Sequence, residues 1–380
     1  MKIVIDSNIL FAEELFKGFG ELVFYKNIIS DKNILKDADA LLCRSTMKVG
    51  AELLSETKVK FIATATSGTE HIDKTYLDKS KIKFADAKGS NSNSVAEYVI
   101  SAILNIAAKN NLSLNGKTLG IIGLGNCGKK VESKAKAIGL NVIVNDPPLE
   151  EIGENKNFSS IEEILGCDII TIHTPLIKEG KYKTEGLFDS LKISQLKKET
   201  IFINSARGKI VDEVELVKAK EKGVVSRIVL DVWENEPQIN FGLLNHIDIA
   251  TPHIAGHSYD GKVAGSFMVF KSFCDFFKTE IETAKSPINV NKFLEEEQNI
   301  IQISPAGNIE QDLYRAVSAA YNIEIDDANM RKIPSINDKT SYFNSLRNNY
   351  WKRREFSNTQ ITCENEKLAR CFLGMGFKIK

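Results

Sequence analysis

The sequence has few of the residues that build disulfide frameworks or metal sites. Its 380 residues include six cysteines, and no two of them form a Cys-x-x-Cys pair. This spacing excludes a disulfide scaffold and a zinc ribbon, so we expect reduced cysteines that fill space in the interior. No histidine pair is interpreted as a metal site either, and we expect no bound metal.

Long hydrophobic runs and a targeting segment are also missing. No apolar run reaches the roughly 18 residues that a membrane span needs. The chain starts directly as a strand, at Met1-Lys-Ile-Val-Ile-Asp6, and not as a signal peptide. We therefore expect a cytoplasmic protein without a membrane partner.

Neither sign of charge is in excess. The chain carries 50 basic and 50 acidic side chains, so its formal net charge is zero. No global field draws nucleic acid or an anionic membrane to such a protein, and an anionic ligand needs a local site. The length allows two or three domains, each with its own core.

What the chain does have is a glycine-rich loop between an apolar strand and an amphipathic helix, within Thr118–Lys130. The loop reads Gly123-x-Gly125-x-x-Gly128, and the next apolar strand ends in Asp146. This order is the dinucleotide-binding fingerprint, in which the glycines allow a tight turn, close approach of a pyrophosphate and close helix packing. The start of the helix offers N–H groups to the phosphates. Asp146 favours NAD, since its carboxylate suits two ribose hydroxyls and repels a 2′-phosphate.

Apolar runs alternate with helical patterns along most of the chain, which predicts parallel sheets covered by helices. The predicted strands of the first part lie at 2–5, 22–25, 40–43, 61–65 and 82–84. Those of the second part lie at 118–122, 141–146, 168–173, 200–204, 227–231 and 247–250. The fold class that we predict is α/β, with two doubly wound, Rossmann-like parallel sheets and a small C-terminal α+β module.

The module begins near residue 290, after a predicted linker at 285–289. Its basic and aromatic cluster, Tyr350-Trp-Lys-Arg-Arg354, is interpreted as a solvated helix end or a subunit contact and not as a nucleic-acid patch, because the chain is neutral. Apolar faces near Leu313 and Phe343 would permit dimerisation.

Polar side chains follow several strands, at the edge where parallel sheets bind ligands. Arg207, Glu236 and His253 form a set suited to oxidising a hydroxy acid with NAD. His253 can accept the hydroxyl proton, Glu236 can hold the other ring nitrogen, and Arg207 can bind the adjacent carboxylate. Arg44 and Ser45 suit a phosphate or carboxylate, although a solvated turn arginine explains Arg44 equally well. His71 is expected to be a locally hydrogen-bonded helix-start histidine.

Four motifs, in this order, resemble those of the D-isomer specific 2-hydroxyacid dehydrogenase family. They are the Gly123 loop, Asn204–Gly208, Leu230–Pro237 and Pro252-His253. The resemblance covers about residues 1–285 and implies the roles given above for Arg207, Glu236 and His253. It also implies a discontinuous substrate domain at 1–93 and 257–285, with an NAD domain at 94–256 inserted in it.

Further segments resemble the members of this family that oxidise 4-phospho-D-erythronate in vitamin B6 biosynthesis. These segments are 43–45, 63–66, 146–148, 173–184, 253–261 and the module after residue 290. The resemblance implies that residues 286–380 form a dimerisation domain. It implies substrate contacts at Ser45 and Thr66 and at position 257, where His257 replaces the usual tyrosine. Arg44 is expected to join them as a phosphate ligand. The residues expected to line the NAD site are Gly123, Gly125, Asn126, Cys127, Gly128, Asp146, Thr174, Ser205, Ala206, Arg207, Asp231 and Gly256.

Two alternatives remain open at this point. One is another D-2-hydroxyacid dehydrogenase, acting on 3-phosphoglycerate or D-lactate. The other is an NAD-sensing binding protein, since corepressors have reused this fold. A corepressor should carry low-complexity extensions, whereas residues 290–380 have the patterns of a folded module.

Overall fold

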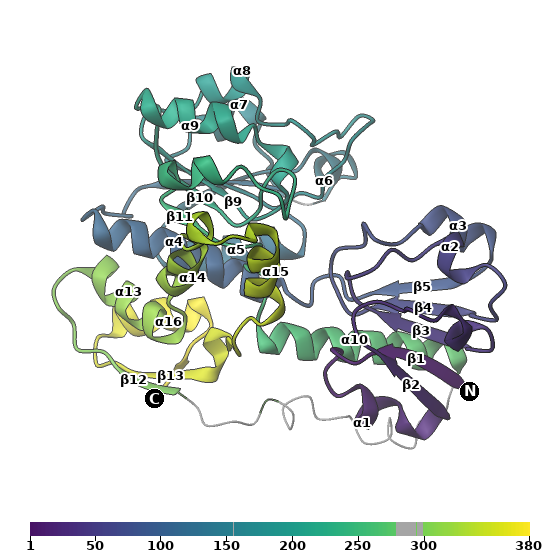
Figure 1. Cartoon of the computed structure of the whole chain (residues 1–380). Coiled ribbons are helices and arrows are strands. Elements are labelled where there is room, and N and C mark those ends of the chain that lie inside the picture. Colours follow the sequence, from purple (N-terminus) through teal and green to yellow (C-terminus); the bar gives the residue numbers. More distant parts are fainter. Residues whose placement is uncertain (155, 279–293, 295–298) are drawn as a thin grey trace. The chain divides into compact units, whose positions relative to one another are not determined.

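The computed structural model describes residues 1–154, 156–278, 294 and 299–380. It forms two compact units (Figure 1), which we call the N-terminal unit (Met1–Asn91 with Ser258–Glu297) and the glycine-loop unit (Ser92–His257 with Gln298–Lys380). Within the described ranges, no helix is long and apolar enough to cross a membrane. The linker predicted at 285–289 lies outside the described residues.

The N-terminal unit contains a five-stranded parallel sheet in the order β2-β1-β3-β4-β5. Its strands are β1 (Lys2–Asp6), β2 (Glu21–Tyr25), β3 (Ala40–Cys43), β4 (Phe61–Thr64) and β5 (Lys83–Asp86). All five predicted strands are therefore confirmed. The helices of this part are short: α1 (Ala12–Phe16), α2 (Ala51–Leu54) and α3 (Lys74–Lys79). The helix start expected at His71 lies slightly further on, because Asp73 caps α3 with a side chain that accepts the backbone N–H of Tyr76.

Helix α10 (Tyr259–Phe277) joins this unit from far along the chain and runs beside the sheet (Figure 1). It begins at Ser258, whose hydroxyl accepts the backbone N–H of Gly261. The ring of Phe16 meets those of Phe270 and Phe273 edge to face, with centroids 5.3 and 5.2 Å apart. Aromatic burial of this kind fixes α10 to the sheet although the two are distant in sequence.

The glycine-loop unit contains a six-stranded sheet in the order β11-β10-β9-β8-β6-β7, and all its pairs are parallel. Its strands are β6 (Thr118–Ile122), β7 (Asn141–Asn145), β8 (Ile169–Ile172), β9 (Thr200–Asn204), β10 (Val225–Leu230) and β11 (Ile249–Ala250). The six predicted strands are confirmed. Because the pairs are parallel, every carboxyl end lies at one edge of the sheet, which we call the carboxyl edge.

Helices accompany this sheet in the glycine-loop unit. They are α4 (Ser92–Lys109), α5 (Asn126–Ala137), α6 (Pro147–Glu151), α7 (Ile161–Leu165), α8 (Ser190–Ser194) and α9 (Glu213–Glu221). Helix α4 is buried on nearly all sides, since one face packs on α5 and another on the C-terminal helices. A helix enclosed in this way needs apolar residues around most of its circumference, as the sequence 95–107 provides.

The C-terminal segment, residues 299–380, belongs to the same compact unit as the glycine loop. Its elements are β12 (Asn299–Gln302), α13 (Ile309–Ala320), α14 (Ile323–Met330), α15 (Lys339–Asn348), β13 (Thr359–Thr362), α16 (Glu366–Met375) and β14 (Lys378–Ile379). The three strands form a parallel sheet in the order β12-β13-β14. Helix α13 packs on α4, and α16 packs on α5 (Figure 1).

Two interpretations of this segment were wrong. Arg353 is not at a solvated helix end but fully buried, with its guanidinium 3.7 Å from the centre of the Tyr321 ring. It donates to the carbonyls of Ala255 at 3.2 Å and Ser94 at 2.9 Å. Leu313 and Phe343 are also buried within this chain and do not present free apolar faces.

Candidate active site

The glycine loop leaves open space at the start of α5. Gly123 has a φ of +91°, and a Cβ there would lie 2.9 Å from the His173 carbonyl group. A Cβ on Gly128 would lie 2.0 Å from the carbonyl oxygen of Gly123, so only glycine lets the helix approach the strand this closely. A Cβ on Gly125 would meet nothing within 4 Å. The loop is therefore tight on its inner side and open on the side where N–H groups can hold a phosphate.

Asp146, which follows β7, is joined to this loop. One of its carboxylate oxygens accepts the backbone N–H of Leu124 at 2.7 Å, and the other accepts that of Leu149 at 3.1 Å and caps α6. The half-buried carboxylate is thereby fixed beside the turn of the glycine loop. Asn126 at the start of α5 is exposed.

Two hydroxyls at the carboxyl edge have no hydrogen-bond partner among the described residues. The Oγ1 atom of Thr174, after β8, and the Oγ atom of Ser205, after β9, are both buried. An unpaired buried hydroxyl is costly, and a bound polar ligand would relieve that cost. Together with the open glycine turn, these two atoms fit a dinucleotide at this edge.

Cys127 fills space in the glycine loop, as predicted. Burial raises the pKa of its thiol to about 11, and the positive charge of Arg207 only partly opposes this. A thiol with so high a pKa carries almost no thiolate near neutrality and is a poor nucleophile.

The turn after β9 packs against the loop after β10. A Cβ on Gly208 would lie 2.0 Å from the carbonyl carbon of Trp233, so glycine is required there. Arg207, the preceding residue, is half-buried and donates from Nη1 to the carbonyl of Ala206 at 2.7 Å. Ala206 itself is buried. This contact holds Arg207 and the Trp233–Glu236 loop at neighbouring positions of the carboxyl edge.

Glu236 and His253 are in direct contact. The Nδ1 atom of His253 lies 2.7 Å from one carboxylate oxygen of Glu236, and the other oxygen accepts the backbone N–H of Trp233, also at 2.7 Å. Burial would raise the pKa of Glu236, but His253, that N–H and Arg347 outweigh it and hold the pKa below its ordinary value. Glu236 is thus kept ionised, and its contact leaves the Nε2 atom of His253 for other partners.

Asp231 fixes the loop that carries His253 by hydrogen bonds. His253 has a φ of +58°, a conformation uncommon for a non-glycine residue, and its N–H donates to the Asp231 carbonyl at 2.6 Å. The buried Asp231 carboxylate accepts the N–H groups of Ile254 at 2.8 Å and Ala255 at 2.9 Å. The Thr251 hydroxyl donates to the same carboxylate at 2.6 Å. This network fixes the loop as far as Ala255, so Asp231 shapes the site through the backbone.

His257 closes this loop and contacts the C-terminal segment. Its ring meets that of Tyr350 edge to face, with centroids 5.8 Å apart. The Tyr350 hydroxyl donates to Asp326 at 2.7 Å. His257 is therefore positioned partly by a residue that the sequence motifs did not single out.

The remaining predicted residues lie in the N-terminal unit. Arg44 is half-buried and donates to Asp6 at 3.3 Å and to Asn27 at 3.2 Å, so it is not simply solvated. Ser45 is exposed. Thr66 follows β4, and its hydroxyl contacts that of Thr64 at 2.8 Å and the Gly68 carbonyl at 3.1 Å.

His71 agrees with the prediction of a locally bonded histidine. Its Nε2 atom lies 3.2 Å from the Thr64 hydroxyl, and burial lowers its pKa to about 4. In the parts of the chain that the structure describes, no cluster of His, Cys, Asp or Glu could hold a metal ion.

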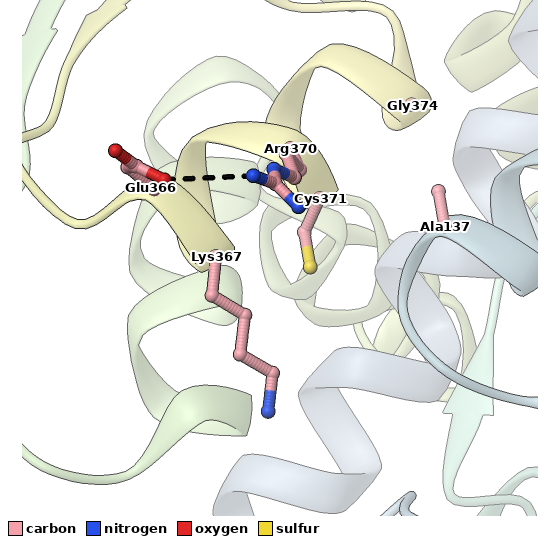
Figure 2. Close-up of a pocket in the computed structure, with 6 residues that line it drawn as sticks. All are labelled: Ala137, Glu366, Lys367, Arg370, Cys371 and Gly374. Atoms are coloured by element: carbon pink, nitrogen blue, oxygen red, sulfur yellow. Dashed lines mark hydrogen bonds and ion pairs between the residues drawn. The ribbon is translucent and has the colours of Figure 1, made fainter.

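A separate hollow lies between α16 and the last residue of α5 (Figure 2). It is lined by Ala137, Glu366, Lys367, Arg370, Cys371 and Gly374. A Cβ on Gly374 would lie 2.4 Å from that of Ala137, so the two helices touch beside the hollow. It adjoins the opposite end of α5 from the glycine loop and contains none of the predicted site residues.

The sequence motifs missed the residues that the C-terminal segment brings to this edge. Arg353 bonds the Ala255 carbonyl, and the Tyr350 ring contacts that of His257. The only signal in the sequence was the basic and aromatic cluster at 350–354. Its partners lie far away in the chain, so the sequence did not indicate what the cluster contacts.

Comparison with known proteins agrees with the motifs. A family model described as "D-isomer specific 2-hydroxyacid dehydrogenase, NAD binding domain" matches residues 100–255, and one for a domain of unknown function matches residues 294–376. Proteins named erythronate-4-phosphate dehydrogenase from Proteus mirabilis (strain HI4320) and Escherichia coli O157:H7 are each 38% identical over 379 residues. The match spans 99% of this chain and 99% and 98% of theirs.

Solved structures of similar fold bind NAD. D-Lactate dehydrogenase from Aquifex aeolicus, in complex with NAD and lactic acid, is 26% identical with a TM-score of 0.59, covering 76% of this chain and 99% of that one. NAD-bound 3-phosphoglycerate dehydrogenase from Entamoeba histolytica is 28% identical with a TM-score of 0.60, covering 74% and 96%.

Proposed function

The chain belongs to the D-isomer specific 2-hydroxyacid dehydrogenase family, among the erythronate-4-phosphate dehydrogenases, and we propose that it oxidises 4-phospho-D-erythronate with NAD. The products are (R)-3-hydroxy-2-oxo-4-phosphooxybutanoate and NADH, and the reaction belongs to pyridoxal 5′-phosphate (vitamin B6) biosynthesis. The observation that carries this proposal is the His253–Glu236 contact in a unit that also holds the NAD-binding glycine loop.

When bound, NAD would supply the acceptor for the hydride from C2 of the hydroxy acid. His253 accepts the proton of the C2 hydroxyl at Nε2, because its Nδ1 atom is engaged by Glu236 at 2.7 Å. The ionised Glu236 fixes the ring and stabilises the imidazolium that forms. Arg207 binds the adjacent carboxylate and polarises the forming carbonyl group. Hydride and proton leave the same H–C–O–H unit, so the charges balance.

The residues proposed to bind NAD surround the open glycine turn. Gly123, Gly125 and Gly128, with the N–H groups of Asn126 and Cys127, would hold the pyrophosphate. Asp146 would bind the adenosine ribose hydroxyls, and the unpaired hydroxyls of Thr174 and Ser205 are available to the rest of the cofactor. Ala206, Arg207, Asp231 and Gly256 complete the proposed set.

Four further residues are proposed to contact the substrate. Arg44 and Ser45 suit its phosphate, since a guanidinium fork and a hydroxyl are phosphate ligands. Thr66 would add a second hydroxyl. His257 would replace the tyrosine that is usual at this position, and its contact with Tyr350 supports a fixed ring orientation.

We also propose a homodimer formed through residues 286–380, as a third domain beside a substrate domain at 1–93 and 257–285 and an NAD domain at 94–256. Four large apolar side chains of the C-terminal segment are exposed, which supports an interface there: Ile300, Ile325, Trp351 and Leu373. The six free cysteines fit a reducing compartment, and we propose a cytoplasmic location.

A panel of acids tests the proposed substrate. The purified protein should form NADH with 4-phospho-D-erythronate at a kcat/KM at least about tenfold above that with 3-phosphoglycerate or D-lactate. Preference for either of those acids would assign a different dehydrogenase activity. NAD binding without turnover of any acid would instead favour a sensor.

A further inference from the structure

Lys262, near the start of α10, lies on the face of that helix that packs against the sheet of the N-terminal unit. The positions four, seven and eleven residues after Lys262 share its face of the helix. They are Ser266, Val269 and Phe273, and each is at most 1% exposed. The Phe273 ring meets that of Phe61 in β4 edge to face, with centroids 5.9 Å apart. Lys262 is thus the charged first member of a buried row, and its own side chain is exposed.

Helix α10 begins at the carboxyl ends of the strands in this unit. Near the end of the helix, the Phe276 ring stacks on that of Phe61, the first residue of β4, with centroids 5.3 Å apart. Near its start, a Cβ on Gly265 would lie 3.0 Å from the carbonyl oxygen of Ala65, the residue directly after β4. The helix therefore runs antiparallel to β4, and its first turn lies at the edge where parallel sheets bind ligands.

The contact at Gly265 also sets how near Lys262 comes to the loop after β4. Residues three apart on a helix are neighbours, with about 5 to 6 Å between their Cβ positions. Helical side chains lean toward the start of the helix, so that of Lys262 extends away from the buried row and past the ends of the strands. Its long flexible stem can span that spacing, which brings the ammonium within reach of the Ala65–Thr66 loop.

Arg44 lies next to the same loop. The backbone N–H of Ala65 donates to the carbonyl of Cys43 at 2.9 Å, so the residues that follow β3 and β4 are neighbours. The Arg44 guanidinium, however, already has a carboxylate partner, since it donates to the fully buried Asp6 at 3.3 Å. A phosphate group carries up to about two negative charges near neutrality, so binding it here calls for positive charge beyond that of Arg44.

The Lys262 ammonium supplies that charge. Among the residues that the structure describes, no hydrogen bond or ion pair engages it. Partial burial, followed by the charge of Arg44, lowers its pKa, and no carboxylate opposes the shift. The effect of Arg44 agrees with the backbone geometry, which brings both cations to one edge of the sheet. Two cations at this edge, one of them without an anionic partner, suit a bound anion.

We propose that Lys262 is a substrate-binding residue, and that its ammonium acts with the Arg44 guanidinium to bind the phosphate of the hydroxy acid within the N-terminal unit. The proposal rests on the proposed dehydrogenase function and deepens it. The hydroxyls of Ser45 and Thr66, which follow the same two strands, are further phosphate ligands by chemistry. The carboxylate of the substrate is proposed to bind Arg207 instead, so the phosphate is the group left for Lys262.

Steady-state kinetics with 4-phospho-D-erythronate, and with D-erythronate, which lacks the phosphate, test the proposal. We expect Lys262→Met to lower kcat/KM for the phosphorylated acid about 10- to 100-fold through a higher KM, the effect of one lost charge-assisted contact. With D-erythronate the change should stay within about twofold, because the ammonium has no phosphate to bind. Lys262→Arg, which keeps the charge, should recover most of the loss. Calorimetric titration of the NADH-bound protein with both acids makes the same comparison without turnover.

Lys271→Met is the matched control. Lys271 lies nine positions further along α10, on the opposite face of the helix, and pairs with Asp275 at 2.8 Å. This variant should behave as wild type with both acids. Thermal unfolding of all variants identifies misfolding, and Lys262→Gln supplies the kinetic comparison if Lys262→Met does not fold.

The outcomes separate this proposal from the proposed function. A wild type that prefers 3-phosphoglycerate would overturn the proposed substrate, yet Lys262→Met should still lower kcat/KM for that acid relative to D-glycerate. A wild type that prefers 4-phospho-D-erythronate, with unchanged kinetics in Lys262→Met, would overturn the proposal for Lys262 alone. Equal losses with the phosphorylated and the phosphate-free acid would also overturn it, since they would show an effect that is not directed at the phosphate.

Discussion

The Nδ1 atom of His253 lies 2.7 Å from a carboxylate oxygen of Glu236, although 17 positions separate the two residues in the chain. The contact joins the loop after β10 to the loop after β11, two neighbouring strands of one parallel sheet. It aims the second ring nitrogen away from Glu236. In a 2-hydroxyacid dehydrogenase this is the arrangement that a proton acceptor requires.

Replacing His253 with alanine should remove the proton acceptor and leave the NAD site intact. We expect kcat to fall about 10²- to 10⁴-fold, the usual contribution of one proton-transfer group. The affinity for NADH, measured by fluorescence titration, should change less than about threefold. A parallel loss of cofactor affinity would make His253 a structural residue of its loop.

The Glu236→Gln variant should lose the charge that holds the imidazole. We expect kcat/KM to fall about 10²- to 10⁴-fold at neutral pH, with little change in thermal stability, because glutamine can still accept the N–H of Trp233. Full activity in this variant would exclude a role for the carboxylate.

The pH profile of the wild type bears on the same residue. The pKa of Glu236 is below its ordinary value of 4.5, since His253, the Trp233 N–H and Arg347 outweigh the effect of burial. The contribution of the Glu236 carboxylate to activity is therefore present above pH 4.5. It is lost only as the pH falls through the lower pKa that this carboxyl has in the folded protein. A loss of activity that could be assigned to Glu236 above pH 4.5 would contradict this.

Changing Asp146 to serine should relax the preference for NAD. Serine can keep the cap on α6, while the repulsion of a 2′-phosphate disappears. We expect the ratio of kcat/KM with NAD to that with NADP to fall at least about tenfold. Asp146→Glu, which keeps the charge, is the control and should preserve discrimination against NADP.

Glu213 should make the folded state less stable as the pH rises. It is 4% exposed, and burial raises the pKa of its carboxyl from 4.5 to about 7, with the N–H of Glu234 opposing the rise. A carboxyl with a raised folded-state pKa binds its proton more tightly when folded, so its stabilising contribution is present below pH 4.5 and is lost as the pH rises to about 7.

The Glu213→Gln variant has no carboxyl group to ionise at this position, so it should not lose stability as the pH rises to about 7. We expect it to raise the free energy of unfolding at pH 8, relative to wild type, by on the order of 2 kcal/mol. Urea titrations at pH 5 and pH 8 measure the difference, and Glu215→Gln on the same helix is the matched control. An equal effect of Glu213→Gln at both pH values would contradict the account.

The sheets and the nearness of Glu236 to His253 were predictable because their signals are local. Each strand is a short apolar run bounded by polar residues, and the glycine loop stands next to its own strand and helix in the sequence. Parallel pairing then brings the ends of such strands to one edge, so residues as far apart as Arg207 and His253 could be assigned together.

Other features depend on contacts that no local pattern reports. Arg353 bonds the carbonyl of Ser94, 259 residues earlier, so its burial could not follow from the polar sequence around it. Helix α14 has little separation of apolar and polar faces, so no pattern in the sequence marked it. It is joined to β11 by Asp327, whose carboxylate accepts the backbone N–H of Ala250. The burial of Leu313 and Phe343 likewise depends on partners elsewhere in the chain.

Isotope transfer tests the central claim most directly. The enzyme would be incubated with NAD and 4-phospho-D-erythronate carrying deuterium at C2, and the cofactor then analysed by mass spectrometry. We expect that one deuterium moves to the nicotinamide ring for each oxo acid formed, and that His253→Ala slows this transfer about 10²- to 10⁴-fold. Oxo acid formed without deuterium in the cofactor, or no transfer by the wild type, would contradict it.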